Sequence, residues 1–279
     1  MNSFPIISVV MPVYNAEEHL LVAINSILEQ NFKNFEFIII NDGSTDNSQE
    51  IINNVALMDK RIVVLNQKNK GIVASLNAGI LLAKGEFIAR MDADDISRKN
   101  RLEKQLALML RLDADICGCA YTIVDDASMK IRPIKVAATN NQIIVALTVG
   151  VPFAHPTIMM RKSFLDKFNL SYRLAFKAED YCLWMEMYRC GARFANSEED
   201  LFLYRISNAS LSKKNRKDIR PESDKYIKDF VFQYKLDIEN AYKCLMTESM
   251  STDMQRLLAK SIILFFIHTK NIRYFWLFN

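Results

Sequence analysis

Three carboxylates stand within a span of four residues, shortly after an apolar stretch of the chain. Residues 87–89 read Phe-Ile-Ala, and the acids that follow are Asp92, Asp94 and Asp95. Like charges this close repel one another, so folding alone does not favour the arrangement. In an extended segment, Asp92 and Asp94 would place their side chains on the same side of the chain. Paired carboxylates suit a hard divalent cation such as Mg²⁺ or Mn²⁺.

A cation held by so few protein ligands keeps coordination positions for water and phosphate oxygens. We therefore interpret the acidic cluster as a metal site that meets a phosphorylated substrate. The alternative is a solvated acidic turn that caps a helix over residues 95–110. The sequence has no CxxC or HExxH pattern that would favour zinc instead.

A second polar motif, "NDGSTDNS" over residues 41–48, also follows an apolar stretch. Asp42 and Gly43 predict a sharp turn, and the hydroxyl and carboxylate side chains after them can cap the next helix. A turn with a helix cap is one interpretation of the motif. The other is a nucleotide site, in which Asp42 accepts a hydrogen bond from an imide N–H such as that of uracil. In that site Tyr14 would stack on the base.

The first hundred residues alternate between apolar strand patterns and amphipathic helix patterns. The predicted strands cover residues 6–14, 35–48 (with a break at Asp42), 61–67 and 86–92, and the predicted helices cover 16–30, 48–58 and 71–83. Continuous apolar strands between such helices indicate a mostly parallel sheet with helices on both faces. Ligands bind beyond the carboxyl ends of such strands, where Asn15, Asp42 and the acidic cluster fall.

Later segments are more mixed, with predicted helices over residues 101–112 and 179–192 and a strand over 115–126. After about residue 212, a charged, proline-containing link precedes segments that predict helices to the end of the chain. We therefore expect one domain over 1–212 and a helical C-terminal extension over 213–279. The stretch 257–279 is apolar and aromatic. One interpretation is interfacial membrane binding, in which Phe265 and other aromatic rings would lie at the lipid headgroups. The other is packing on the core or on a dimer partner.

Composition excludes several classes of protein. Half of the 279 residues are hydrophobic, enough for a large core, and the formal net charge is only +4. This mild charge does not indicate nucleic-acid binding, and none is expected. The N-terminus resembles a first strand rather than a signal peptide, and no apolar run is long enough for a transmembrane helix. The five scattered cysteines predict small buried side chains in a reducing cytosol.

The motifs, taken in order, resemble those of family 2 glycosyltransferases with the GT-A fold. They read "ISVVMPVYN", "NDGSTDNS", "NKGIVASLNAGI", "KGEFIARMDADD" and "KAEDYCLWMEM". The resemblance covers residues 6–212, and "RMDADDIS" with "PFAHPTIMMRK" looks most like bacterial enzymes that build O-antigen, capsule or exopolysaccharide. It implies an α/β fold with a Rossmann-like, mostly parallel sheet, helices on both faces and a helical C-terminal extension.

The resemblance also implies roles for individual residues. Asp180 matches the general base, with its neighbour Glu179 as the alternative, and His155 lies in a loop expected to meet the acceptor. Asp94 and Asp92 match the metal ligands, with Asp94 the more direct, so the implied cofactor is Mn²⁺ or Mg²⁺. The positions that match donor-nucleotide contacts are Pro12, Tyr14, Asn15, Asp42, Gly71, Asp92 and Arg205.

These roles have structural alternatives, and two positions depart from the family pattern. Glu179 and Asp180 could be simple first-turn acids of a helix, whose N-terminus would hold Asp180 ionised. Arg205 could form a structural ion pair instead of meeting the diphosphate. Many relatives carry Arg before the Asn of an "ARN" segment, where this chain has Leu76, and many carry His where it has Ser207. The third metal ligand is therefore left open.

The implied reaction is a single inverting displacement from a UDP-sugar onto an acceptor hydroxyl, with no enzymic nucleophile. A hexose or an N-acetylhexosamine is the expected group, and a saccharide linked to a polyprenyl diphosphate is the expected acceptor. The enzyme would then work in the cytoplasm at the inner face of the cell membrane, with peripheral contact through its C-terminus and with a homo-oligomer as an option. The alternatives are a nucleotide-sugar-binding or scaffolding subunit without catalysis, and a phosphatase with a DxD nucleophile.

Overall fold

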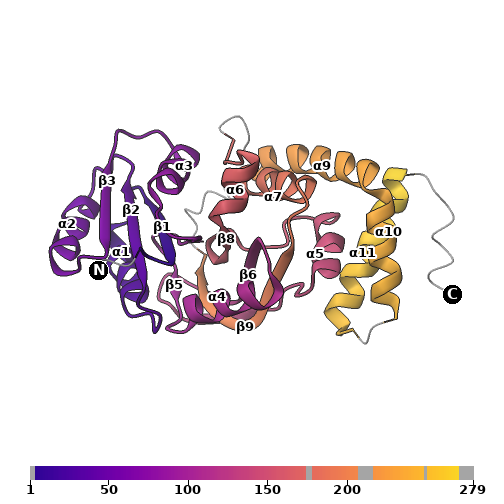
Figure 1. The fold of residues 1–279 in the computed structure, drawn as a ribbon, viewed down its shortest axis with the longest axis horizontal. Helices are drawn as coiled ribbons and strands as arrows, with labels where there is room; N and C mark the ends of the chain where they lie inside the picture. Colours follow the sequence, from indigo (N-terminus) through magenta and orange to yellow (C-terminus); the bar gives the residue numbers. More distant parts are fainter. Residues whose placement is uncertain (1–3, 174–177, 207–215, 248–249, 270–279) are drawn as a thin grey trace.

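The computed structural model describes residues 4–173, 178–206, 216–247 and 250–269, with the backbone alone over 216–223. Within these residues, the strands form one nine-stranded sheet in the order β3-β2-β1-β4-β8-β6-β9-β5, and β7 pairs with β6. Figure 1 shows an elongated molecule, with the first strands and helices at one end and the C-terminal helices at the other.

The elements have the following bounds. The strands are Ile7–Val13 (β1), Phe35–Asn41 (β2), Ile62–Asn66 (β3), Phe87–Arg90 (β4), Ile96–Ser97 (β5), Ile116–Val124 (β6), Lys130–Ile134 (β7), Met159–Arg161 (β8) and Phe194–Arg205 (β9). The helices are Glu17–Leu28 (α1), Ser48–Met58 (α2), Ile72–Leu82 (α3), Arg101–Leu112 (α4), Asn140–Leu147 (α5), Lys162–Phe168 (α6), Glu179–Arg189 (α7), Arg216–Gln233 (α9), Lys235–Met246 (α10) and Thr252–Thr269 (α11), with a 3₁₀ turn at His155–Thr157.

Helices cover both faces of the sheet, because successive side chains of a strand point to opposite faces. In β1, Val10 belongs to a core shared with α3, α5, α7 and the C-terminal helices. Its neighbours Val9 and Met11 belong to a second core, shared with α1, α2 and α4. Burial on both faces explains why these strands are apolar without interruption. The predicted α/β sheet with helices on both faces is confirmed.

The sheet is parallel in its first half and mixed in its second. β3, β2, β1 and β4 run parallel to one another, as the sequence predicts. β8 is antiparallel to both of its neighbours, β4 and β6, and β9 runs parallel to β6. The carboxyl ends of β1, β2, β4, β6 and β9 therefore face the same edge of the sheet. Residues that follow these strands can meet there although they are far apart in sequence.

The C-terminal helices pack on the body of the protein. In α11, Phe265 is fully buried, and its ring lies 5.7 Å from that of Tyr242 in α10. The Ser261 hydroxyl forms hydrogen bonds with Tyr242 at 2.8 Å and with Thr148, just after α5. For Phe265, the structure contradicts the interpretation as a membrane contact and bears out the alternative, packing on the core.

The remainder of the tail, residues 270–279, lies outside the described residues. No described helix is both long enough and apolar enough to cross a bilayer. The division into a domain over 1–212 and an extension over 213–279 stays a prediction, and α9 to α11 share their core with the sheet.

Candidate active site

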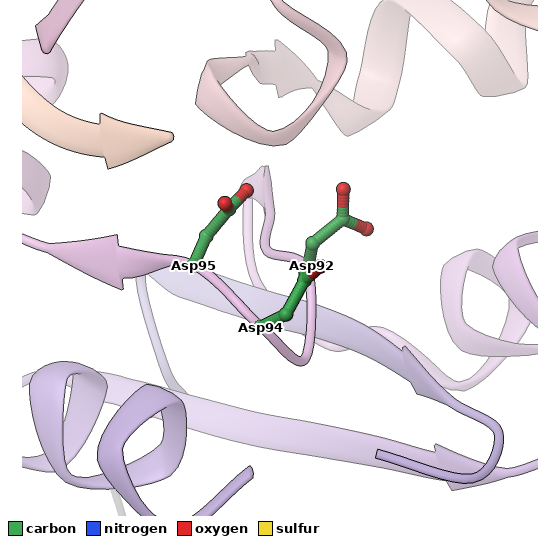
Figure 2. A group of neighbouring side chains, drawn as sticks. All are labelled: Asp92, Asp94 and Asp95. Atoms are coloured by element: carbon green, nitrogen blue, oxygen red, sulfur yellow. The ribbon is translucent and has the colours of Figure 1, made fainter. Parts of the chain in front are cut away.

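The acidic cluster forms a loop between β4 and β5. Arg90 ends β4, and Asp92, Asp94 and Asp95 follow before β5 begins. One carboxylate oxygen from each of the three acids lies within 4.8 Å of the others. Figure 2 shows the side chains of Asp92 and Asp95 rising from the same side of this loop. A helix over 95–110 is excluded, because β5 intervenes and α4 begins at Arg101.

The acidic loop carries more negative charge than its surroundings balance. Burial and the neighbouring Asp92 carboxylate raise the pKa of Asp94 to about 6. Burial, Asp92 and Asp94 together raise the pKa of Asp95 well above its ordinary value. Among the described residues, Oδ2 of Asp95 is buried without a hydrogen-bond partner. A bound divalent cation would relieve this repulsion, and an all-oxygen set of this kind fits Mg²⁺ or Mn²⁺.

Arg90 supplies an internal counter-charge to the acidic loop. Its guanidinium is buried and donates to both carboxylate oxygens of Asp92, at 2.5 and 2.6 Å. This clamp leaves Asp94 and Asp95 as the less compensated carboxylates. The charge of Arg90 also favours the ionised forms of Glu179 and Asp180, at the start of α7.

Asp42, which follows β2, organises the loop that leads into α3. One of its carboxylate oxygens accepts hydrogen bonds from the Gln67 side chain at 2.7 Å and from the Lys70 backbone N–H at 2.8 Å. The other accepts from the Gly71 backbone N–H at 2.8 Å. A carboxylate oxygen can accept two hydrogen bonds. The second oxygen of Asp42 therefore keeps the capacity to accept one from a ligand.

The ends of β1 and β2 are tied together beside Asp42. The Asn15 side-chain oxygen accepts from the Thr45 backbone N–H at 2.8 Å, and the Asn15 backbone N–H donates to Ser44 at 3.1 Å. Asn15 has a left-handed backbone, with φ of +49°, which short polar side chains tolerate. Tyr14, in this turn, is 52% exposed, and Pro12 near the end of β1 is half-buried.

Glu179 and Asp180 open α7, as predicted. Burial raises the pKa of both carboxyl groups, that of Glu179 to about 7. The hydrogen bond that Oδ1 of Asp180 accepts from the Tyr181 backbone N–H at 2.7 Å favours the ionised form, as expected at a helix N-terminus, but burial outweighs it and the net shift of the pKa is upward. A raised pKa makes a carboxylate a better proton acceptor.

His155 lies beside the acid pair. Its Nε2 forms a hydrogen bond with the Tyr172 hydroxyl at 2.8 Å, and its Nδ1 lies 4.0 Å from a carboxylate oxygen of Glu179. Burial and the nearby charge of Arg90 lower the pKa of His155 well below its ordinary value, so the ring is neutral. The ring also meets that of Trp184 edge-on, with centroids 6.0 Å apart.

Tyr172 shows that the acidic loop and the acid pair belong to one site. Burial raises the pKa of its phenol, and the charges of Arg90, Asp92, Glu179 and Asp180 all act on it. Residues from β4, from the loop after it and from the start of α7 therefore lie within electrostatic reach of one another. Such an arrangement can hold a cation and accept a proton at neighbouring points.

Arg205, at the end of β9, is brought to the acidic loop but is already engaged. Its guanidinium donates to the backbone carbonyls of Asp94, Asp125 and Asp126. Nη2 donates to the Ser128 hydroxyl. Among the described residues, the side-chain partners are thus neutral oxygen atoms rather than the ion pair that the sequence suggested as an alternative. Ser207 lies outside the described residues, so the third metal ligand stays open.

Sequence reasoning did not assign Arg90 or Tyr172 to the site, and it did not name Asp95 as a ligand. The signal for Arg90 was present, because a charged residue that ends a buried strand needs a partner. Asp95 was seen only as part of the charge cluster, although its burial and its unpaired oxygen make it a candidate ligand beside Asp94. Nothing in the sequence around Tyr172 indicated that its hydroxyl would meet His155.

Comparison with known sequences agrees with this geometry. Residues 8–170 match the profile described as glycosyl transferase family 2. The O-antigen biosynthesis glycosyltransferase WbnJ of Escherichia coli is 33% identical over 210 residues, which are 74% of this chain and 82% of WbnJ.

Two solved structures share the fold. TarS 1–349 of S. aureus in complex with UDP-GlcNAc has a TM-score of 0.67 at 19% identity, over 96% of this chain and 74% of that one. The mannosyltransferase PcManGT of Pyrobaculum calidifontis in complex with GDP-Man and Mn²⁺ has a TM-score of 0.62 at 14% identity, over 98% and 88%. With the family profile matched over the greater part of its sheet and its acidic loop in place, the chain belongs to glycosyl transferase family 2.

Proposed function

We propose that this glycosyltransferase is metal-dependent and inverting, and that it moves a sugar from a UDP-sugar to a hydroxyl group of a saccharide acceptor. The observation that carries the proposal is the meeting of two acidic groups in one site. The acidic loop after β4 and the acid pair that opens α7 are both within reach of Arg90 and Tyr172. A cation site next to a proton acceptor is what this reaction requires.

The donor nucleotide is assigned to the ends of β1 and β2. Asp42 would accept a hydrogen bond from the imide of the base on its free acceptor position, and the exposed Tyr14 ring would stack on the base. Pro12, Asn15 and Gly71 would shape the same site through the backbone. Asp92, at the start of the acidic loop, would also contact the donor nucleotide.

The chemistry is assigned to the acidic loop and to α7. Asp94 and Asp92 would hold the cation, with Asp94 as the direct ligand and the neighbouring Asp95 as a further candidate. A bound Mn²⁺ or Mg²⁺ would neutralise charge on the departing diphosphate. Asp180 would take the proton from the acceptor hydroxyl as that oxygen attacks the anomeric carbon, with Glu179 as the alternative base. His155, neutral and beside the pair, would contact the acceptor.

The wider role is assigned by likeness to relatives. WbnJ is named as an O-antigen enzyme, which supports surface polysaccharide assembly on a lipid-linked acceptor. The TarS complex with UDP-GlcNAc supports a UDP-sugar as the donor. Because PcManGT is in complex with GDP-Man, GDP-sugars should also be tested as donors. We place the reaction in the cytoplasm at the inner face of the membrane, with residues 270–279 as the candidate contact.

The test is a screen for nucleoside diphosphate release. Each of a set of hexose and N-acetylhexosamine donors, on UDP and on GDP, is offered with an acceptor that carries a sugar on a polyprenyl diphosphate. We expect acceptor-dependent UDP release with one donor, and NMR of the product should show an inverted anomeric centre. Nucleotide binding without turnover on any acceptor would favour a binding subunit, and hydrolysis of phosphomonoesters would favour a phosphatase.

A further inference from the structure

Arg205 occupies a junction between three parts of the sheet. It is the last residue of β9 and pairs with Val124, the last residue of β6. β9 also pairs with β5, which begins directly after Asp95. Arg205 is only 4% exposed, although its side chain is long and charged. A buried guanidinium at such a position needs several acceptors.

Those acceptors come from two loops. Towards the acidic loop, the Arg205 backbone N–H donates to Oδ1 of Asp95 and its Nε–H donates to the Asp94 carbonyl, both at 2.7 Å. Towards the turn between β6 and β7, Nη1 donates to the carbonyls of Asp125 and Asp126, both at 2.7 Å.

The remaining contact completes a brace between the loops. Nη2 of Arg205 donates to the Ser128 hydroxyl at 2.9 Å. A guanidinium has five N–H donors in a rigid planar fork, and these contacts with described residues use four of them. Lysine could not reproduce the brace, because its ammonium is a point charge without a second, fixed direction.

We propose that Arg205 is a positioning residue, which fixes the acidic loop in the geometry that binds the cation and does not contact the donor diphosphate. The inference rests on the proposed metal-dependent function. The acidic loop holds like charges that repel one another, and the guanidinium restrains it at the Asp94 carbonyl. The contact with the Asp95 carboxylate comes from the Arg205 backbone N–H and is kept in any substitution of the side chain. Groups outside the ligand shell that orient ligands in this way typically change metal affinity by about 10–100-fold when they are replaced.

The test is Mn²⁺ binding without nucleotide, measured by electron paramagnetic resonance of the full chain. We expect Arg205→Lys to weaken Mn²⁺ binding about tenfold or more, although the positive charge is kept. Excess Mn²⁺ should restore most of kcat, because the defect lies in occupancy. The matched control is Arg98→Lys, since Arg98 forms an ion pair with Asp200 at 2.6 Å outside the site. That variant should bind Mn²⁺ like the wild type.

A role at the diphosphate predicts the opposite pattern. Arg205→Lys would then bind Mn²⁺ normally and lose affinity for UDP relative to uridine, and that result would overturn the inference. If Arg205→Lys does not fold, Ser128→Ala decides, because Ser128 is exposed and its loss leaves the arginine in place. It should weaken Mn²⁺ binding about two- to fivefold, and unchanged binding there contradicts the brace. If the wild-type chain binds no Mn²⁺, the proposed metal site is contradicted, and so is the positioning role of Arg205 that rests on it.

Discussion

The two acids that open α7 differ in what surrounds them. Burial and the negative charges of Asp180 and Asp92 all raise the pKa of Glu179, whereas burial alone raises the pKa of Asp180. Arg90 favours the charged form of both. Neighbouring carboxylates thus oppose the ionised form of Glu179 and not that of Asp180, and this difference supports Asp180 as the base.

Paired substitutions distinguish the two acids. Asp180→Asn should lower kcat by about 10²–10⁴-fold, the usual contribution of a general base, and leave the KM for the donor nearly unchanged. Glu179→Gln should retain most of the activity. Steady-state kinetics on both variants check this, and an inactive Glu179→Gln beside an active Asp180→Asn would reverse the assignment.

The raised pKa of Glu179 also has a consequence for stability. Its pKa is about 7 in the native state, against an ordinary value of 4.5 that the side chain regains when the chain unfolds. Between these pH values the native state binds more protons at this site than the unfolded state does, so the free energy of unfolding falls as pH rises. Glu179→Gln removes that contribution, and its free energy of unfolding should fall less steeply over the same range.

Urea denaturation at a series of pH values measures the effect. The control is Glu199→Gln, which removes an exposed carboxylate that pairs with Lys104 at 3.2 Å. An unchanged pH dependence in Glu179→Gln would mean that the carboxyl group is not buried in solution.

At the residue scale, the sequence predicted the acids and not their partners. Asp92 and Asp94 could be located because paired carboxylates after an apolar strand follow a readable pattern, whereas Glu179 and Asp180 were assigned through the family resemblance. The shift of Asp180 could not be predicted, because burial is set by the packing of distant segments such as the one that carries Tyr172. A helix N-terminus is visible in the sequence, whereas the desolvation that opposes it is not.

Among the elements, α3 has a positioning role that its sequence hides. The Asn77 side chain donates to the Tyr172 carbonyl at 2.8 Å and accepts from the Tyr172 backbone N–H at 3.0 Å. It therefore pairs with the backbone as a neighbouring strand would. Because the Tyr172 hydroxyl is hydrogen-bonded to His155, this clamp links α3, which begins directly after Gly71, to the expected acceptor side of the site.

Removal of the clamp should cost both stability and acceptor binding. Asn77→Ala leaves the buried backbone groups of Tyr172 without partners, which should lower the free energy of unfolding by about 1–3 kcal/mol. The KM for the acceptor should rise more than the KM for the donor. Asn53→Ala on α2 is the control, because it removes only an exposed hydrogen bond with Gln49. A stability loss equal to that of the control would contradict the clamp.

Elements with a clear period follow from the sequence, and several short or interrupted elements do not. The predicted α2 (48–58) and α4 (101–112) have the observed bounds. β8 was missed because three residues give no period. β9 was missed because polar residues at 197–200 interrupt its apolar pattern. At this point the register between β9 and β6 shifts, and these polar residues lie outside the core. α5 had a readable signal, the capping box of Thr139 and Gln142, which was overlooked.

Across the whole molecule, one hydrophobic core joins the sheet to the C-terminal helices. Val10 of β1 and Phe265 of α11 belong to the same cluster of buried side chains. The apolar character of the tail was evident in the sequence, but the surface on which α11 packs was not. A helix that packs on a protein core and one that lies on a membrane bury the same kinds of side chain.

This packing predicts a large loss of stability from a change in α11. Phe265→Ala should lower the free energy of unfolding by about 3–5 kcal/mol, the usual cost of removing a fully buried phenylalanine. Ile267→Ala is the control, since Ile267 is 58% exposed and its loss should stay within about 0.5 kcal/mol. Urea denaturation of both variants checks the difference, and equal effects would contradict the packing of α11.

The central claim is that the acidic loop works through a divalent cation. The most direct measurement is the rate of UDP release as a function of free Mn²⁺, for the wild type, for Asp94→Asn and for the control Asp166→Asn, which changes an exposed acid on α6. We predict that wild-type activity disappears in EDTA and returns with Mn²⁺ or Mg²⁺. Asp94→Asn should stay inactive at every concentration, while Asp166→Asn behaves like the wild type. Full wild-type activity in the presence of chelator would contradict the claim.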